Sequence, residues 1–204
     1  MPAGQMLVTA NEAASITGVP LRQVHRIIDA GLLEGAVKRQ RNARLLKRNA
    51  LIGLKLAHET ADVLTAQGRR AVVATLIRRP GQAVIRTDAV VVDSRAAAKA
   101  VRSGLNQLTK ARRFVSITPS VLGGTPVFRG TRIPVHDIAD MLWNGDNLSA
   151  IVKAYPQLNK ERVRLAAIYA LAYPRRGRRR TKTRWRSRPS RTSETIAFDA
   201  AVRV

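Results

Sequence analysis

Arg22, Gln23 and Arg26 are the first residues of this sequence whose types and spacing could do chemistry. Guanidinium and amide groups make the hydrogen bonds that read base edges and hold phosphates in DNA. Apolar residues interleave with them at i, i+3 and i+7, namely Leu21, Val24 and Ile28. This periodicity predicts a helix over 20–30 that buries the apolar set and turns the polar set outward. Nucleic-acid contact is one interpretation of that face, and an ordinary solvated helix surface is the other.

A second short helix is predicted just before this one. Thr9 and Glu12 have the T-x-x-E spacing of a capping box, in which each side chain hydrogen-bonds the backbone of the other residue. Gly18 is a natural end for that helix, and Pro20 suits the start of the next. Two short helices joined by a tight turn, the second with exposed basic and amide groups, are typical of a helix-turn-helix.

Lys38, Arg39, Arg41 and Arg44 follow within seven positions. They predict a basic loop or small wing lying along phosphates, with a solvated loop as the alternative. The stretch 45–77 is expected to be rich in helix, with a break at Gly68.

The charge of the whole chain favours a polyanionic partner. Its 37 Lys and Arg exceed 13 Asp and Glu, which gives +24 over 204 residues. Nucleic acid is the expected partner of such an excess. Cysteine is absent, and no apolar run reaches the ~18 residues of a membrane span. We therefore expect a cytoplasmic protein without a membrane segment.

The residue types do not favour an enzyme. His25, His58 and His136 are spread along the chain, and the sequence after His58 lacks the second histidine of a zinc-protease motif. Glycine-rich phosphate-binding motifs do not occur in it. Asp137 and Asp140 lie three residues apart, which fits a helix surface better than a metal site. We expect no catalysis, no cofactor and no metal.

Composition and periodicity predict a mainly α fold with short β segments. Two helix-turn-helix-like domains are expected at 1–79 and 119–173, joined by an α/β connector at 80–118 and followed by a basic tail at 174–204. The connector is expected to contain one or two strands within 83–92, a helix over 95–108 and a short strand over 114–117.

Turn residues and apolar periodicity organise the region 119–173. Glycine and proline within 120–135 predict compact turns and a hairpin. Three helices are expected after it: one following Pro134, one around 148–152, and one that begins after Asn159. Trp143 and Tyr155 are predicted core residues.

The tail differs sharply from the rest of the chain. It contains 11 Lys and Arg and 2 Asp and Glu, a net charge of 11 − 2 = +9. Such a segment is expected to order only on a partner. Near its end Ile196, Phe198, Val202 and Val204 place apolar groups at even positions, which would suit a strand added to another protein's sheet.

The stretches GGTPVFRGTRIPV (123–135) and WNGDNLSAIVKAYPQLNKERVRLAAIYALAY (143–173) closely resemble the family of domains of unknown function numbered four hundred and thirty-three. Members of that family look like antitoxins of VapBC-type pairs, whose toxin is a PIN-domain ribonuclease. Residues 7–45 resemble the winged helix-turn-helix of MerR-like regulators.

The resemblance implies an antitoxin that represses its own operon and blocks a ribonuclease. The active site of a PIN domain, as the family implies, is a cluster of carboxylates around a divalent metal, which guanidinium groups can enter. The expected toxin-binding residues are therefore Arg175, Arg176, Arg178, Arg179, Arg180, Trp185, Ile196 and Phe198. A homodimer that assembles with toxin into a larger complex, on double-stranded operator DNA, is the expected state.

Further DNA contacts are expected in the region 119–173, at Arg129, Arg132, Lys160, Arg162 and Arg164. Arg132 has an alternative role as an internal ion-pair partner of Asp137 or Asp140. The alternative function for the whole chain is a regulator or nucleoid-type nucleic-acid-binding protein that has no toxin partner.

Overall fold

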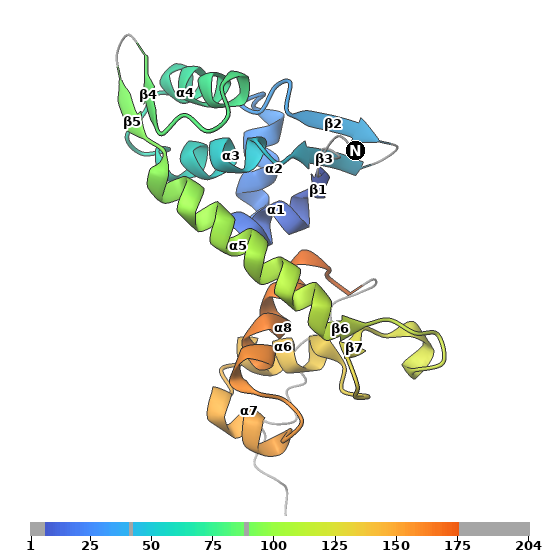
Figure 1. The fold of residues 1–204 in the computed structure, drawn as a ribbon. Helices are drawn as coiled ribbons and strands as arrows, with labels where there is room; N and C mark the ends of the chain where they lie inside the picture. The colour runs from blue at the N-terminus through green and yellow to red at the C-terminus, as the bar shows by residue number, and fades with distance from the viewer. Residues whose placement is uncertain (1–6, 41–42, 88–89, 176–204) are drawn as a thin grey trace, which may run out of the picture. The chain divides into compact units, whose positions relative to one another are not determined.

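The computed structural model describes residues 7–40, 43–87 and 90–175. Within them the chain is mainly helical with short β-hairpins, which confirms the predicted mainly α class (Figure 1). The elements of the first half are β1 (Leu7–Thr9), α1 (Ala10–Thr17), α2 (Leu21–Asp29), β2 (Val37–Gln40), β3 (Ala43–Lys47), α3 (Ala50–Glu59), α4 (Ala66–Arg78), β4 (Val84–Arg86) and β5 (Val91–Asp93). Those of the second half are α5 (Arg95–Phe114), β6 (Val115–Ser116), the 3₁₀ turn η1 (Leu122–Gly124), β7 (Val127–Phe128), α6 (Val135–Trp143), α7 (Leu148–Ala154) and α8 (Lys160–Ala172).

The start of the chain folds as its local sequence predicts. The capping box at α1 is present: the Thr9 N–H donates to Glu12 Oε2 at 2.8 Å, and the Glu12 N–H donates to Thr9 Oγ1 at 3.2 Å. Gly18 ends α1 in the left-handed conformation, with φ +72°, and its N–H donates to the Ala14 carbonyl. The three residues Gly18–Pro20 then turn the chain into α2. α1 and α2 thus form the predicted helix pair.

The predicted break at Gly68 is wrong. The interruption lies at 60–65, between α3 and α4, and Thr65 caps α4 by accepting the Gly68 N–H at 3.1 Å. Gly68 is thus part of the first helical turn, because a capping threonine outweighs the weak helix propensity of one glycine. The helix expected over 95–108 also runs six residues further, to Phe114.

α5 contributes to all three apolar clusters of the described residues. Val101, Leu105 and Leu108 join the first cluster, with α1, α2 and α3. Ala111 joins the second, with α6 and α8, and Ala97 joins a small third cluster with Leu56, Val72, Leu76 and Ile85. One helix therefore completes the cores on both sides of it.

Close packing of α5 on α1 depends on a glycine. A Cβ built on Gly104 would lie 2.0 Å from the carbonyl oxygen of Ile16. Since carbon and oxygen atoms do not normally approach more closely than about 3.3 Å, any other residue would force the helices apart.

In the second half, the hairpin predicted within 120–135 is present: the Phe128 N–H donates to the Ile133 carbonyl and the Val135 N–H donates to the Pro126 carbonyl, each at 3.0 Å. The antiparallel pairing of β6 with β7 adds to it, with Val115 opposite Phe128 and Ser116 opposite Val127. Val127 also forms a bridge with Pro134. The Phe128 ring is buried in the second cluster, so its burial favours the pairing of β6 with β7 next to that cluster. The three helices predicted after it are present as α6, α7 and α8.

The core assignment of Trp143 is wrong. Its side chain is 52% exposed, because it is the last residue of α6 and lies past the buried positions Val135, Ile138 and Ala139. Tyr155 is half-buried and packs against the second cluster.

Candidate nucleic-acid interface

α2 presents one apolar and one polar face. Val24 and Ile27 are its buried residues, whereas Arg22, His25 and Arg26 are exposed and Gln23 is half-buried. The polar assignment of the two arginines therefore agrees with the structure.

The predicted inward set on α2 needs correction. Leu21 is 38% exposed and Ile28 is only partly buried. The buried face is centred on Val24 and Ile27, at i and i+3, because Leu21 is the first residue of the helix and lies at its edge. The same rotation places His25 in the exposed set, a residue that the periodicity argument did not use. Its position three residues after Arg22 is the signal that could have identified it.

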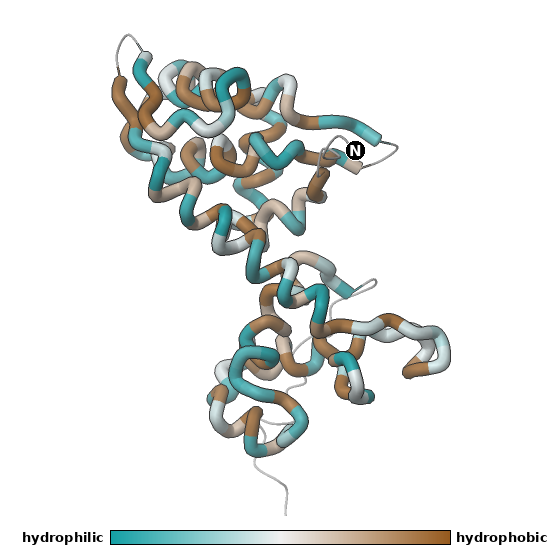
Figure 2. The backbone as a smooth tube through the Cα atoms, viewed as in Figure 1, coloured by the Kyte–Doolittle hydropathy of each residue, from teal (hydrophilic) through white to brown (hydrophobic). Residues whose placement is uncertain are grey.

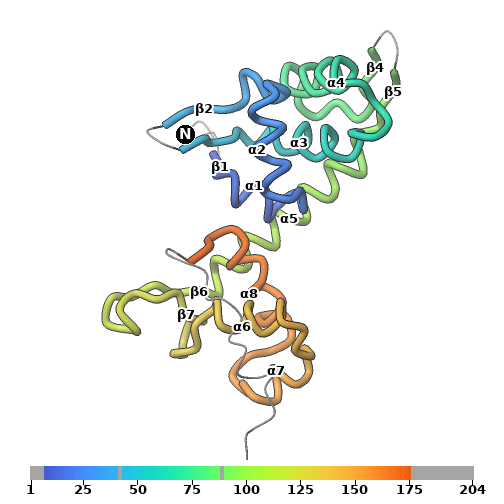
Figure 3. The backbone as a smooth tube through the Cα atoms, turned by 180° about the vertical axis from the view of Figure 1, so that it is seen from behind, coloured from blue at the N-terminus to red at the C-terminus, as the bar shows by residue number. Residues whose placement is uncertain are grey.

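The basic stretch after α2 forms a wing. β2 and β3 pair as a hairpin, with Lys38 opposite Leu45 and Arg39 opposite Arg44, and β1 adds a third strand in the order β1-β3-β2. Lys38 and Arg39 are exposed. Figure 2 shows β2 as a hydrophilic stretch, and two opposite views place the hairpin next to α2 (Figure 3). Arg41 lies outside the described residues.

Two contacts hold α2 in place against neighbouring elements. Arg44 of β3 forms an ion pair with Asp29, the last residue of α2. Arg70 of α4 donates to the carbonyl oxygen of Ala30 at 3.1 Å. A cation at a helix C-terminus is favourable because the terminal carbonyls carry partial negative charge. Arg44 thus serves to fix the wing to α2, a different role from the phosphate contact suggested by its sequence neighbours.

The helix pair predicted to be a second helix-turn-helix-like unit, α7 and α8, offers less free surface. α8 is buried at six positions: Val163, Leu165, Ala166, Tyr169, Ala170 and Ala172. Lys160 and Arg164 are exposed, but the guanidinium of Arg162 lies 5.2 Å from the centroid of the Phe114 ring and also donates to the Gln157 carbonyl at 3.4 Å. Because α8 is a core helix, its geometry suits DNA reading less well than that of α2.

Arg129 and Arg132 are both exposed and lie in the loop between β7 and α6. The turn between them is held by the Thr131 N–H, which donates to the Phe128 carbonyl at 2.9 Å. The structure therefore presents these two cations on the second half of the chain and does not join them to the α2 face.

Glu12, Arg112 and Tyr173 form a polar cluster that sequence reasoning missed. The Tyr173 hydroxyl and the Arg112 guanidinium each donate to Glu12 Oε1 at 2.5 Å, and Arg112 Nε also donates to the Tyr173 oxygen at 2.6 Å. Arg112 additionally lies over the Tyr173 ring, 5.6 Å from its centroid. The cluster joins α1, α5 and the end of α8. No local pattern reveals it, because the partners of Glu12 lie 100 and 161 residues away.

The cluster changes the acidity of its members. Burial alone raises the pKa of the Glu12 carboxyl, but hydrogen bonds from Tyr173 and the Thr9 backbone, with the charge of Arg112, outweigh burial and lower the pKa. Burial, together with the hydrogen bond to Glu12, raises the pKa of Tyr173 to about 12. Glu12 is therefore held as a carboxylate and Tyr173 as a neutral phenol at neutral pH.

The same end of α8 contacts α6. His136 is buried, and its Nε2 donates to the carbonyl oxygen of Tyr173 at 2.7 Å. This places His136 in a structural hydrogen bond.

Most of the predicted toxin-binding residues lie in a part of the chain that the structure does not describe. Of the predicted toxin-binding residues, Arg175 is described and exposed, whereas Arg176, Arg178, Arg179, Arg180, Trp185, Ile196 and Phe198 lie outside the described residues. Over 7–40, 43–87 and 90–175 there is no group of three metal-ligating side chains, and no helix in that part of the chain is long and apolar enough to cross a membrane.

Comparison with known proteins identifies the family of this chain. Over 196 residues the chain is 37% identical to the uncharacterized protein y4eO of Sinorhizobium fredii (strain NBRC 101917 / NGR234), an alignment that covers 88% of this chain and 87% of y4eO. The chain belongs to the y4eO family. Within this chain, residues 115–170 form a DUF433 domain, and the description of that domain family is 'protein of unknown function'. That match begins at β6 and confirms the resemblance seen in the sequence.

Among solved structures, the X-ray crystal structure of Rv2018 from Mycobacterium tuberculosis matches with a TM-score of 0.30 and 16% identity. The match covers 79% of this chain and 96% of that one.

Proposed function

We propose that this y4eO-family protein is a VapB-type antitoxin that binds operator DNA of its own operon and inhibits a PIN-domain ribonuclease. It acts by binding and is not an enzyme. The observation that carries the DNA-binding part is the exposed face of α2, with Arg22, His25 and Arg26, beside a hairpin that exposes Lys38 and Arg39. The antitoxin part is supported by the resemblance of the stretches 123–135 and 143–173 to a family whose members look like antitoxins of VapBC-type pairs.

In this proposal α2 enters the major groove and the wing lies along the adjacent phosphates. The N-terminal half of a recognition helix contacts base edges, which suits Arg22 and Arg26, since Arg donates two parallel hydrogen bonds to guanine. Lys38 and Arg39 supply sequence-independent attraction that weakens as salt rises. A homodimer would require a palindromic operator with half-sites about one helical turn, or a multiple of it, apart.

A second candidate function is favoured by the net charge of +24, of which the tail contributes +9. In that case the protein coats nucleic acid without sequence preference and has no toxin partner. The two functions differ in their binding to a fragment upstream of the gene and to a scrambled fragment of equal length. An operator-binding protein prefers the first by about a thousandfold or more, whereas a coating protein binds both alike.

The ribonuclease partner is tested by co-expression with the adjacent open reading frame, followed by pull-down. The full-length protein and a version that ends at Tyr173 are compared. A stable complex with the full-length protein supports the antitoxin function, and its loss on truncation places the inhibitory segment in the tail. Failure of both forms to bind the adjacent product contradicts that function and leaves a DNA-binding regulator.

A further inference from the structure

α5 has a strong excess of positive charge. Its 20 residues include six Lys and Arg and no Asp or Glu. Three of the six cations form ion pairs with acids, namely Arg95, Lys110 and Arg112. The other three are exposed and have no ion pair or hydrogen bond with any residue that the structure describes, namely Lys99, Arg102 and Arg113.

The three unpaired cations lie on one side of α5. Successive residues of a helix are rotated by about 100°, so Lys99, Arg102 and Arg113 fall within about 60° of one another around the helix axis. The exposed amide of Asn106 lies in the same sector, whereas the buried residues of the helix, Leu108 among them, are on the opposite side. We call Lys99, Arg102, Asn106 and Arg113 the α5 stripe. At a rise of about 1.5 Å per residue, the stripe is about 21 Å long.

The helices packed on α5 do not neutralise the stripe. α1, α3 and α8 pack on it, and each of them contains one acidic residue. All three acids are already in ion pairs: Glu12 with Arg112, Glu59 with Lys55, and Glu161 with Lys110. The stripe therefore keeps its positive charge and attracts an anionic partner.

The α5 stripe and the exposed face of α2 are separate surfaces. Val24 and Ile27 of α2 are buried in the same apolar cluster as Val101 and Leu108 of α5. α1 and α3 each contact both helices (Figure 1). Each of the two helices turns its buried side toward the shared cluster, so their exposed sides point away from it in different directions. A duplex contacted by α2 would thus leave the stripe free.

The form of the stripe favours the backbone of a nucleic-acid duplex. Phosphates of each strand follow at about 3.4 Å along the duplex axis, so a rigid row of cations of this length spans about six base pairs. Single strands are usually held by aromatic side chains that stack on the bases, and the stripe contains none. A helix that binds an anionic membrane exposes an apolar side, whereas the apolar side of α5 is buried in the protein.

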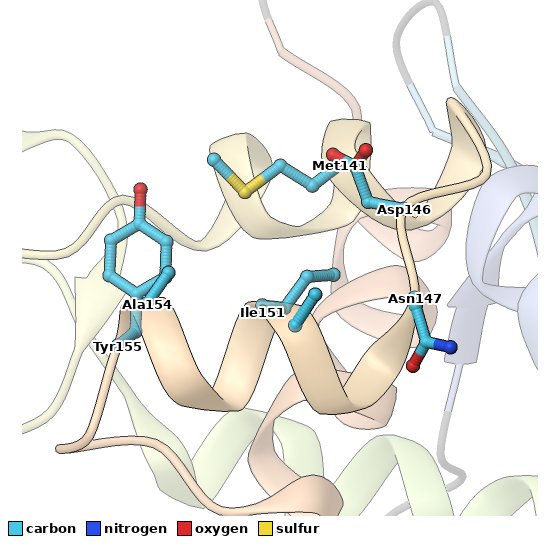
Figure 4. Close-up of a pocket in the computed structure, with 7 residues that line it drawn as sticks. Met141, Asp146, Asn147, Ile151, Ala154 and Tyr155 are labelled. Carbon is cyan, nitrogen blue, oxygen red and sulfur yellow. The ribbon is translucent and has the colours of Figure 1, made fainter.

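The groove between α6 and α7 offers no comparable site for an anion. Its volume is about 250 Å³, and the one charged residue among those that line it is Asp146. In Figure 4 Met141 and Ile151 lie between Tyr155 at one end and Asp146 at the other. A carboxylate repels phosphate, so phosphates are expected at the stripe and not in this groove.

We propose that the α5 stripe is a second DNA-binding surface, which holds the phosphate backbone of a duplex segment other than the one contacted by α2. Its binding does not depend on base sequence, because phosphate contacts carry no sequence information. The inference adds a second duplex to the proposed operator binding and does not depend on the antitoxin function. One protein molecule would then join operator DNA to another segment of DNA.

The test uses the full-length protein bound to the fragment upstream of its gene, which is immobilised on beads. The apparent affinity for a labelled DNA duplex of scrambled sequence is then measured over a range of salt concentrations. The stripe variant combines Lys99→Gln with Arg102→Gln. The control variant combines Arg79→Gln with Lys153→Gln, which removes the same charge at exposed sites at the end of α4 and on α7. Circular dichroism of each variant checks that the helices are retained.

All three proteins are expected to bind the upstream fragment alike. The wild type and the control variant should capture the labelled duplex, whereas the stripe variant should bind it at least tenfold more weakly. The slope of log affinity against log salt should also fall by about two in the stripe variant, because each phosphate contact contributes about 0.9.

Equal affinity of the stripe variant and the wild type for the labelled duplex overturns the proposal. A wild type that binds the upstream fragment but captures no second duplex also overturns it and leaves operator binding intact. If the protein binds the upstream and scrambled fragments alike, operator binding is refuted, and beads that hold the scrambled duplex give the same comparison between the two variants. Capture of a labelled RNA duplex but not of the DNA duplex overturns the assignment to DNA.

Discussion

Replacement of Gly104 by alanine tests the contact between α5 and α1. The added Cβ would lie 2.0 Å from the Ile16 carbonyl oxygen, 2.8 Å from its carbonyl carbon and 3.0 Å from its Cα. Ordinary carbon–oxygen contacts begin at about 3.3 Å, so the helices must separate by more than about 1 Å. All three atoms belong to the backbone of α1, and a side-chain rotation cannot relieve the overlap.

The expected destabilisation follows from two opposing effects. Overpacking of this kind costs about 1–3 kcal/mol, and we use the upper end because backbone must move. Alanine is better than glycine within a helix by about 1 kcal/mol, which partly offsets that cost. The net loss for Gly104→Ala is then about 2 kcal/mol, or roughly 4–8 °C in melting temperature for a domain of this size.

The assay is thermal and urea unfolding followed by circular dichroism. Gly68→Ala is the control, since it also adds a methyl group to a helix but finds its nearest neighbour, Thr65 Oγ1, at 3.4 Å. Gly53→Ala is intermediate, because its Cβ meets a side-chain atom, Val73 Cγ1, at 3.0 Å, a distance from which a small shift gives relief. We expect Gly68→Ala to be the most stable of the three variants, Gly53→Ala to be less stable, and Gly104→Ala to be the least stable. If Gly104→Ala is as stable as Gly68→Ala, the packing of α5 on α1 described above is incorrect.

Three other outcomes can be measured. Glu12→Gln is expected to lower the free energy of unfolding by about 1–2 kcal/mol at pH 7. The substitution removes the charge that strengthens the hydrogen bonds from Arg112 and Tyr173, and Arg112 is partly exposed, which limits the loss. Because the folded pKa of Glu12 is below its ordinary value of 4.5, the carboxylate's contribution is complete above pH 4.5 and is lost as pH falls through the folded pKa, so the two proteins should converge in urea titrations at low pH. Arg26→Ala is expected to cost about 1–3 kcal/mol of affinity for operator DNA in a gel-shift titration, and an equal loss in Arg102→Ala, at an exposed site on α5, would argue against α2 as the reader. Asp29→Asn, which removes the ion pair to Arg44, should change folding stability by less than about 1 kcal/mol yet weaken DNA binding, and unchanged DNA affinity would show that the wing needs no such support.

Local interactions explain which parts of the fold the sequence could predict. The capping box of Thr9 and Glu12, the left-handed Gly18 and the side-chain cap of Asn159 all act within four residues, and the helices they border lie where expected. The strands over 83–92 likewise form a local hairpin. The exposed face of α2 could be predicted for the same reason, since helical periodicity orders neighbouring residues about a single axis.

Contacts between distant residues explain the failures. Gly104 packs closely on Ile16, about 90 positions away in the sequence. The cluster at Glu12 likewise joins residues 100 or more positions apart. Trp143 matches the composition of a core residue, but its exposure is decided by where α6 extends past its neighbours. Periodicity also does not distinguish α8, which is buried at six of its 13 positions, from α2, which is buried at two of nine.

The length of α5 gives a role to the stretch 80–118, for which the sequence suggested only a connection. Val101, Leu105 and Leu108 complete the cluster that α5 shares with α1, α2 and α3, and Ala111 belongs to that of the DUF433 domain. Neither cluster is complete without α5, so its two ends cannot move independently of the cores that they fill. The end of α8 is thus linked to α1 through the side chains packed on α5 and through the hydrogen bonds of Glu12 with Arg112 and Tyr173. Under the proposed function, this linkage is the physical basis for coupling between toxin binding at the DUF433 domain and DNA binding at α2.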